Sequence, residues 1–195
     1  IGLKKRFLFL TIWSLANYLT WSLMAFVLAD FYFKGSSLIE VILWANLGAS
    51  IAGLLIGPII DKIDMRKYTF ISFLTATISF LPILAYTIFN FKSLYLFYSL
   101  TFINLFFITM TWFVRTIYEP TLFPTTNRAF YIGIVRGIAM TTYTISTYLT
   151  SSLPLWGFDI YGMGFQGLGL IASVYWIKRG EDVRYKSLDV LSKIK

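Results

Sequence analysis

The chain has 195 residues, of which 57% are hydrophobic and only 13% are charged, and its mean hydropathy is +0.71. A soluble domain carries about 25% charged residues, so this composition excludes a water-soluble enzyme, a disordered region and a disulfide framework. The sequence holds no cysteine and no histidine, which removes thiol catalysis, Cys/His metal sites and any His-dependent triad. We therefore expect no enzyme activity, no cofactor and no metal.

Six long runs with few or no charges follow one another along the chain. A membrane-spanning helix needs about 20 predominantly apolar residues. The runs predict six transmembrane helices near residues 7–29, 38–60, 68–90, 93–114, 129–151 and 160–177. We expect residues 1–177 to form one all-α integral membrane bundle and residues 178–195 to form a cytoplasmic tail. The first run is too long for a signal peptide, and five similar runs follow it.

The positive charges predict the orientation of these helices. Six spans put both termini on one side, and only Lys34 and Lys92 fall on the other side, with Arg136 inside a helix. Because basic residues favour cytoplasmic loops, we expect a multi-pass protein of the cell membrane with both termini in the cytoplasm. This topology explains the net charge of +8 without a nucleic-acid partner. The basic residues on the side of the termini are Lys4, Lys5, Arg6, Lys62, Arg66, Lys67, Arg115, Arg128, Lys178, Arg179, Arg184, Lys186, Lys193 and Lys195.

The predicted connections are short, and the longest covers residues 115–128. It contains Pro120 and Pro124, which we expect to exclude a continuous helix there. Glycines four residues apart occur in two predicted helices, at residues 53 and 57 and at residues 133 and 137. Such pairs let helix backbones approach closely in lipid, so they predict tight helix packing.

A carboxylate followed by a basic turn closes the second predicted helix, with Gly57, Asp61, Lys62, Arg66 and Lys67 as its members. This segment resembles the G-x-x-x-D-[RK]-x-G-R-[RK] loop of the major facilitator superfamily. Asp64 takes the place of the turn glycine, and Asp tolerates a left-handed turn better than most residues. A carboxylate at a helix end can pair with a neighbouring bundle in one conformation and release it in another. The alternative is that the basic residues only enforce topology.

Two further segments carry a similar resemblance. Before the fifth predicted helix, Phe123, Pro124, Thr125 and Arg128 are similar to the E-x-[FY]-P-T-x-x-R loop of sugar-porter-type major facilitators. Glu119 lies two residues before the glutamate position of that family, and it is able to reach either Arg128 or Arg115. After the last helix, a third segment is similar to the E-T-[RK]-G-x-S-L-[ED] tail of sugar porters, through Asp182, Arg184, Ser187, Leu188 and Asp189.

The resemblance implies that the six helices are one half of a major facilitator fold, made of two inverted three-helix repeats. The chain matches the carboxy-terminal half of a twelve-helix transporter, and its start at Ile1 instead of Met agrees with a fragment that lacks the amino-terminal half. The implied function is secondary active or facilitative transport of a small polar solute, a sugar or an organic acid, by alternating access. The alternative function is a six-helix channel, or a structural or assembly subunit that acts as an oligomer.

Protons are a candidate coupling ion. A buried Asp or Glu is the usual proton carrier in a membrane pump. The carboxylates of this chain fall near the two predicted membrane surfaces, so we expect the proton-carrying group to lie in the amino-terminal half. A membrane enzyme is a third alternative, but the chain has few side chains that could act in catalysis.

Polar and tryptophan side chains inside the predicted helices are the candidates for solute binding, because such groups usually face a cavity or a partner helix in lipid. For a single Asn or Gln the alternative is a hydrogen bond between helices. For Trp the alternative is a position at the lipid surface. The candidates are Trp13, Asn17, Trp21, Asn46, Asn104, Trp112, Arg136 and Gln166.

Arg136 is the most informative of these candidates. It follows Arg128 by eight residues, which places it about 12 Å deeper along a helix at 1.5 Å per residue. That depth is near the middle of a hydrocarbon core about 30 Å thick, where a charge needs a partner. We expect no carboxylate of this half at the same depth. The partner is then an acid of the other half or a substrate, and the alternatives are snorkelling or a fixed pair with Glu119.

Overall fold

The computed structural model describes residues 2–21, 27–33, 35–180 and 182–183, and all regular elements within them are helical. Six long helices account for most of these residues. They are α1 (Leu3–Thr20), α3 (Ser36–Ile56), α4 (Met65–Ile88), α5 (Leu94–Thr121), α6 (Arg128–Leu149) and α7 (Leu155–Arg179). The short elements are α2 (Ala29–Tyr32) and two 3-10 turns, η2 (Ile60–Lys62) and η3 (Thr125–Asn127).

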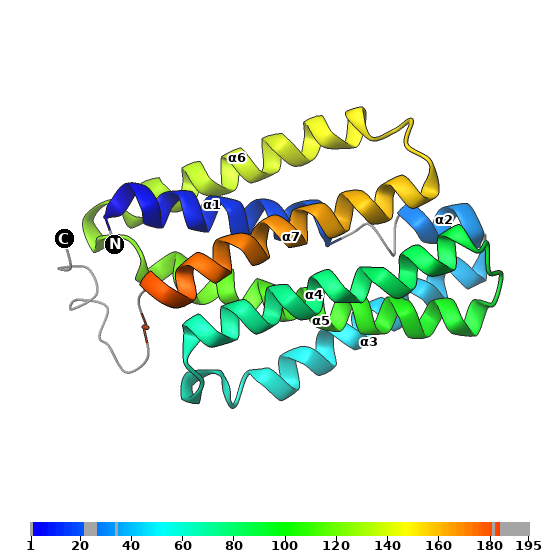
Figure 1. Ribbon diagram of the computed structural model, residues 1–195, viewed down its shortest axis with the longest axis horizontal. Coiled ribbons are helices and arrows are strands. Elements are labelled where there is room, and N and C mark those ends of the chain that lie inside the picture. The colour runs from blue at the N-terminus through cyan, green and yellow to red at the C-terminus, as the bar shows by residue number, and fades with distance from the viewer. Residues whose placement is uncertain (1, 22–26, 34, 181, 184–195) are drawn as a thin grey trace.

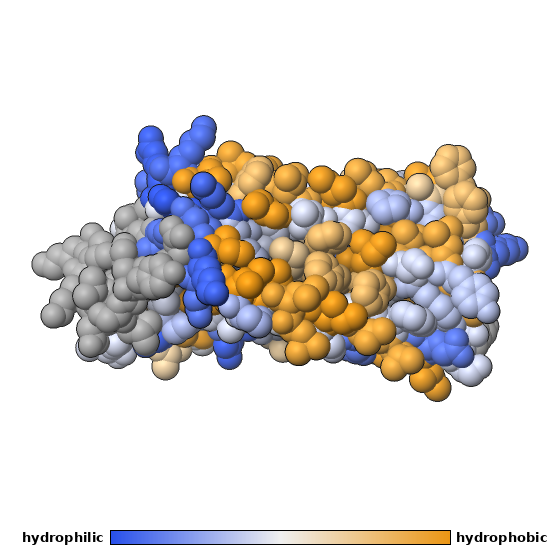
Figure 2. Space-filling view, turned by 90° about the horizontal axis from the view of Figure 1, so that it is seen from below, coloured by the Kyte–Doolittle hydropathy of each residue, from blue (hydrophilic) through white to orange (hydrophobic). Residues whose placement is uncertain are grey.

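The long helices lie roughly along one common axis, and successive helices run in opposite directions (Figure 1). The start of α1 and the end of α7 lie at the same end of the bundle, which we call the basic end because Lys4, Lys5, Arg6, Lys178 and Arg179 belong to it. The opposite end is called the far end. Figure 2 shows a broad apolar band between two polar ends on one face of the molecule, as expected for a bundle that crosses a bilayer.

Four helices, α3, α4, α5 and α7, are long and apolar enough to cross a membrane. They point to a multi-pass membrane protein. The described residues thus contain four candidate membrane spans, whereas the sequence predicted six. The described part of α1 ends at Thr20 and contains three basic residues in its first turn, and residues 22–26 of the predicted first helix lie outside the described residues. The helix α6 is 22 residues long but carries Arg128, Arg136 and many hydroxyl side chains, which lower its hydropathy.

The expectation of a loop over residues 115–128 is wrong for its first half. The helix α5 continues through Pro120 to Thr121, and only residues 122–127 connect it to α6. Pro120 lies in the last turn of α5, where its ring removes one backbone hydrogen bond without ending the helix early. The bond two residues later is intact, since the Leu122 amide donates to the Tyr118 carbonyl at 3.0 Å. Arg115 and Glu119 therefore share one helical face.

The helix packing follows a repeated pattern. The helix α5 packs against α3 and α4, and α1 packs against α6 and α7. Two further pairs, α1 with α5 and α4 with α7, join these groups. If α1 is exchanged with α5, α3 with α6 and α4 with α7, the same set of packed helix pairs results. In Figure 1, α3 and α6 accordingly lie on opposite edges of the bundle.

The core has an aromatic cluster toward the basic end. Trp13 of α1 is fully buried and stacks on Tyr118 of α5, with ring centroids 5.3 Å apart, and on Phe73 of α4. Trp176 of α7 meets the Trp13 ring edge-on and donates its indole N–H to the Tyr118 hydroxyl at 3.0 Å. Such edge and offset contacts fix four helices against one another at this end.

Close helix approach occurs at glycines other than those predicted. A Cβ at Gly48 of α3 would overlap the backbone carbonyl of Phe102 in α5, and a Cβ at Gly169 of α7 would overlap the Phe73 ring. In contrast, a Cβ at Gly53, Gly133 or Gly137 would meet nothing within 4 Å. The spacing of four residues was therefore a misleading signal within this bundle, because it does not say which face of a helix meets a neighbour.

Candidate functional site

A pocket of about 420 Å³ lies where α1, α5 and α6 meet. Trp112 of α5 lines it and is approached edge-on by Tyr18 of α1 and by Trp21, which directly follows α1, with ring centroids 5.2 and 5.3 Å away. The remaining lining residues are Thr109 of α5 and Met140 and Tyr143 of α6. We call this the aromatic pocket. Its rings present broad π-faces with few polar groups, an arrangement that suits the apolar face of a solute or a cation.

Arg115 stands between the aromatic pocket and the basic end. Its guanidinium carbon lies 4.4 Å from the Trp112 ring centroid and 4.9 Å from that of Tyr18, so both rings hold it by cation–π contacts. One turn further along α5, Glu119 Oε1 lies 2.9 Å from Arg115 Nε. Both side chains are more than nine-tenths buried. A buried arginine persists only with such partners.

Arg136 of α6 binds the same carboxylate from the other side. Its Nη2 lies 2.6 Å from Glu119 Oε2 and its Nε lies 3.2 Å from Oε1, so the pair is bidentate. Of the Arg136 side chain, 51% is exposed, against 6% for Glu119. We call Arg115, Glu119 and Arg136 the charge triad. It carries one positive charge in excess, and Arg136 is the member with a free surface.

The triad gives Arg136 a partner within this chain, although we expected no carboxylate of this half at the same depth. The fixed pair with Glu119, which the sequence left open as an alternative, is the arrangement found. Two features make it possible: α5 continues as a helix to Thr121, and the long Arg136 side chain reaches toward the basic end. Glu119 also pairs with Arg115 and not with Arg128, whose Nε and Nη2 have no hydrogen-bond partner among the described residues.

Three of the eight binding candidates from the sequence come together here. Trp21 and Trp112 line the aromatic pocket, and Arg136 belongs to the triad. Asn17 lies inside the bundle close by and ties α1 to α5: its amide donates to the Thr111 carbonyl at 3.1 Å and its oxygen accepts from the Thr111 hydroxyl at 2.5 Å. For Asn17 the interhelical hydrogen bond is thus the role that the geometry supports.

The other four candidates lie elsewhere. Trp13 is part of the aromatic core. Asn104 donates to Ser79 at 2.9 Å and joins α5 to α4, and Gln166 donates to Thr20 at 2.7 Å and joins α7 to α1. Asn46 is exposed and bonds to the Ile42 carbonyl of its own helix at 2.9 Å. The helical rotation that separates these residues from the pocket cannot be read from residue type alone.

The loop between α3 and α4 begins just after Gly57 and contains the predicted gating residues Asp61, Lys62, Arg66 and Lys67. Asp61 is exposed in η2, and no described residue forms a hydrogen bond or ion pair with it. Asp64 caps α4 instead of forming the left-handed turn expected at the glycine position. Its φ is −59°, and its carboxylate accepts from the Arg66 amide at 2.9 Å.

The tail segment meets this loop at the basic end. Asp182 interacts electrostatically with Arg66, and Val183 is buried in the core beneath. The first of the predicted tail residues therefore lies beside the gating loop. The remaining ones, Arg184, Ser187, Leu188 and Asp189, lie outside the described residues.

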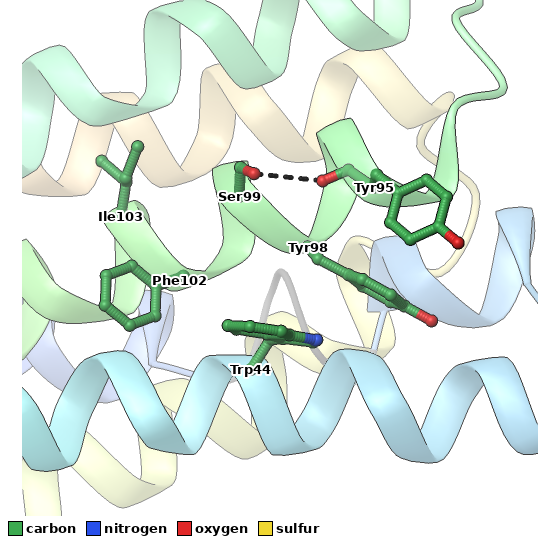
Figure 3. Close-up of a pocket in the computed structure, with 6 residues that line it drawn as sticks. All are labelled: Trp44, Tyr95, Tyr98, Ser99, Phe102 and Ile103. Atoms are coloured by element: carbon green, nitrogen blue, oxygen red, sulfur yellow. Dashed lines mark hydrogen bonds between the residues drawn. The ribbon is translucent and has the colours of Figure 1, made fainter.

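A second aromatic pocket, of about 490 Å³, lies between α3 and α5 (Figure 3). Trp44 of α3 stacks on Tyr98 of α5 with centroids 6.1 Å apart, and Tyr95 meets Tyr98 edge-on. The Tyr98 hydroxyl donates to the Glu40 carboxylate, which fixes the ring. Sequence reasoning missed this pocket, although Tyr95, Tyr98 and Phe102 follow a helical spacing that puts them on one face.

Within the described residues, no three His, Cys, Asp or Glu side chains gather in a way that would hold a metal ion. Comparison of the chain with known protein families, with characterised proteins and with solved structures finds no match. The interpretation of this site therefore depends on its own geometry.

Proposed function

We propose that this chain is the carboxy-terminal six-helix bundle of a secondary transporter that moves a small polar solute, a sugar or an organic acid, by alternating access. The observation that carries the proposal is the aromatic pocket with the charge triad at its edge. Charged groups inside a membrane bundle are rare and usually mark a solute or ion pathway. Here they adjoin a pocket with stacking surfaces that suit a small ring or chain.

The packing pattern supports the same proposal. Alternating-access transporters are commonly built from inverted repeats, with the solute at the repeat interface. The exchange of α1 with α5, α3 with α6 and α4 with α7 leaves the packed pairs unchanged. The aromatic pocket lies between α1 and α5, the two helices that exchange with each other, and α6 completes its lining. In this proposal α1 and α6 cross the membrane together with the four more apolar helices.

The uncovered helices α3 and α6 supply the surface for the amino-terminal half. Only Val135 and Ala139 of α6 are buried, and only four of the 21 residues of α3 are buried, none of them larger than valine. Open glycines on both helices, Gly53, Gly133 and Gly137, leave room for another helix to approach. Asp61 at the basic end pairs with no described residue and is available to bond to that half in one conformation.

In this proposal the protein lies in the plasma membrane with both termini in the cytoplasm. The test is solute uptake by proteoliposomes that contain the full-length product of the parent gene. Labelled neutral sugars and organic anions are offered separately. Trp112→Ala should lower saturable uptake about tenfold or more, whereas the control Trp156→Ala, at an exposed Trp of α7 that does not line the pocket, should not. Conductance without saturable uptake would replace the transporter with the channel alternative.

A further inference from the structure

Asp159 lies just after the first turn of α7 at the far end, and its environment differs from that of every acid discussed above. The residue is only 1% exposed. Neither carboxylate oxygen has a hydrogen-bond partner among the described residues. A buried polar atom without a partner is uncommon in a folded protein and indicates a missing proton, ion or ligand.

The groups that surround Asp159 are neutral. From α4 the Thr87 hydroxyl lies near, but it donates its proton to the Ile83 carbonyl at 3.0 Å. From α2 the Tyr32 phenol acts on Asp159 electrostatically, and burial raises the pKa of Tyr32 above its ordinary value, so this phenol stays uncharged. No cation among the described residues pairs with Asp159, and Lys34 lies outside them.

We propose that Asp159 is a proton-binding site, with its carboxyl group neutral in the closed arrangement seen here. Burial without a counter-charge penalises the ionised form of a carboxyl strongly, and taking up a proton removes that penalty. The bound proton also turns one oxygen into a donor. Opening of the far end would return the group to water, where it ionises.

The site is near solution but closed off from it. Pro154 precedes α7, and Asp159 follows only one turn later, close to the far end of the bundle. This proposal places a proton-carrying acid in this half of the protein, in contrast to the expectation from the sequence. It does not rest on the proposed transport function, since the site would bind a proton whatever the bundle carries.

The test is infrared difference spectroscopy of the purified chain in detergent between acidic and alkaline pH. We expect the carbonyl band of a protonated carboxylic acid, with a downshift in D₂O, at pH 5, where an exposed aspartate is already ionised. The band should vanish in Asp159→Asn and remain in the control Asp30→Asn, which removes an exposed acid of the same end. If Asp159 is ionised, for example in an ion pair with Lys34, the native protein will lack this band. That result overturns the proposal.

Thermal unfolding gives a second measurement that does not require the band to be assigned. The native chain should lose melting temperature as the pH rises from about 4 to 7, because the carboxyl of Asp159 ionises more readily in the unfolded state within this window, whereas Asp159→Asn should lose less over the same range. The isosteric Asn is expected to fold, since it has the shape of the carboxyl group without the charge. An equal pH dependence in both proteins overturns the proposal.

Discussion

Arg136 and Glu119 form a bidentate ion pair that links α6 to α5, with the shorter contact at 2.6 Å. The pair is asymmetric, because the carboxylate is buried while half of the arginine side chain is exposed. The same carboxylate also neutralises the buried Arg115. Glu119 is therefore the structural member of the triad, and Arg136 is the member able to change partners.

This asymmetry predicts unequal effects on stability. Glu119→Gln leaves Arg115 buried without a counter-charge and should lower the free energy of unfolding by about 3 kcal/mol. Arg136→Gln removes a half-exposed partner, and solvent screening limits its effect to about 1 kcal/mol or less. Unfolding of the two variants in mixed detergent micelles measures both values. Equal losses would show that the exposure of Arg136 does not weaken the pair.

Substitution of Arg136 should impair transport more strongly than it lowers the stability of the protein. In the full-length protein we expect Arg136→Gln to abolish uptake and Arg136→Lys to weaken it, because Lys lacks the planar fork of the guanidinium group. Uptake at matched expression levels is the measurement. Competition by organic anions alone would make Arg136 a solute ligand, and competition by neutral sugars alone would leave it as an ion-pair residue. Normal uptake by Arg136→Gln contradicts any role in transport.

Gly48 and Gly53 form a matched pair on α3. Gly48→Ala places a methyl group against the Phe102 carbonyl, a backbone atom that cannot move aside easily, and should lower the free energy of unfolding by about 1–3 kcal/mol. Gly53→Ala faces open space and should cause no loss. Thermal unfolding of the two variants in detergent decides the matter, and comparable losses would argue against the α3–α5 contact.

Asn17 and Asn46 test which polar residues join helices. Asn17→Ala removes both hydrogen bonds to Thr111 and should cost about 1–2 kcal/mol, the range found for polar contacts between membrane helices. Asn46→Ala removes only a bond within an exposed helical turn and should change the unfolding free energy very little. The same micelle assay measures both, and a large effect at Asn46 would imply an unrecognised partner.

Two aspartates of the loop between α3 and α4 should have different effects, Asp64 on stability and Asp61 on transport. Asp64→Ala removes the cap of α4 and should destabilise the bundle by about 1 kcal/mol. Asp61→Asn should leave the stability and equilibrium solute binding of the full-length protein unchanged and slow its flux, because Asp61 has no partner within the described bundle. Flux and binding are measured on the same preparation. Loss of binding in a folded Asp61→Asn protein would contradict the gating role.

The sequence by itself determined the features that depend on composition and local spacing. Runs of apolar residues predicted long helices where the structure has them, because hydropathy and the helical repeat are properties of neighbouring residues. It also singled out Trp21, Trp112 and Arg136, since bulky or charged groups inside apolar helices stand out by type.

Only the tertiary structure decided which of these side chains meet. The rotation of each helix sent Trp13 into the core and Asn46 to the surface, and it brought Gly48 instead of Gly53 against α5. The continuation of α5 through Pro120 carried Glu119 to a position between Arg115 and Arg136. Such contacts join residues far apart in the chain, and their geometry is set by packing between helices, which local sequence patterns do not encode.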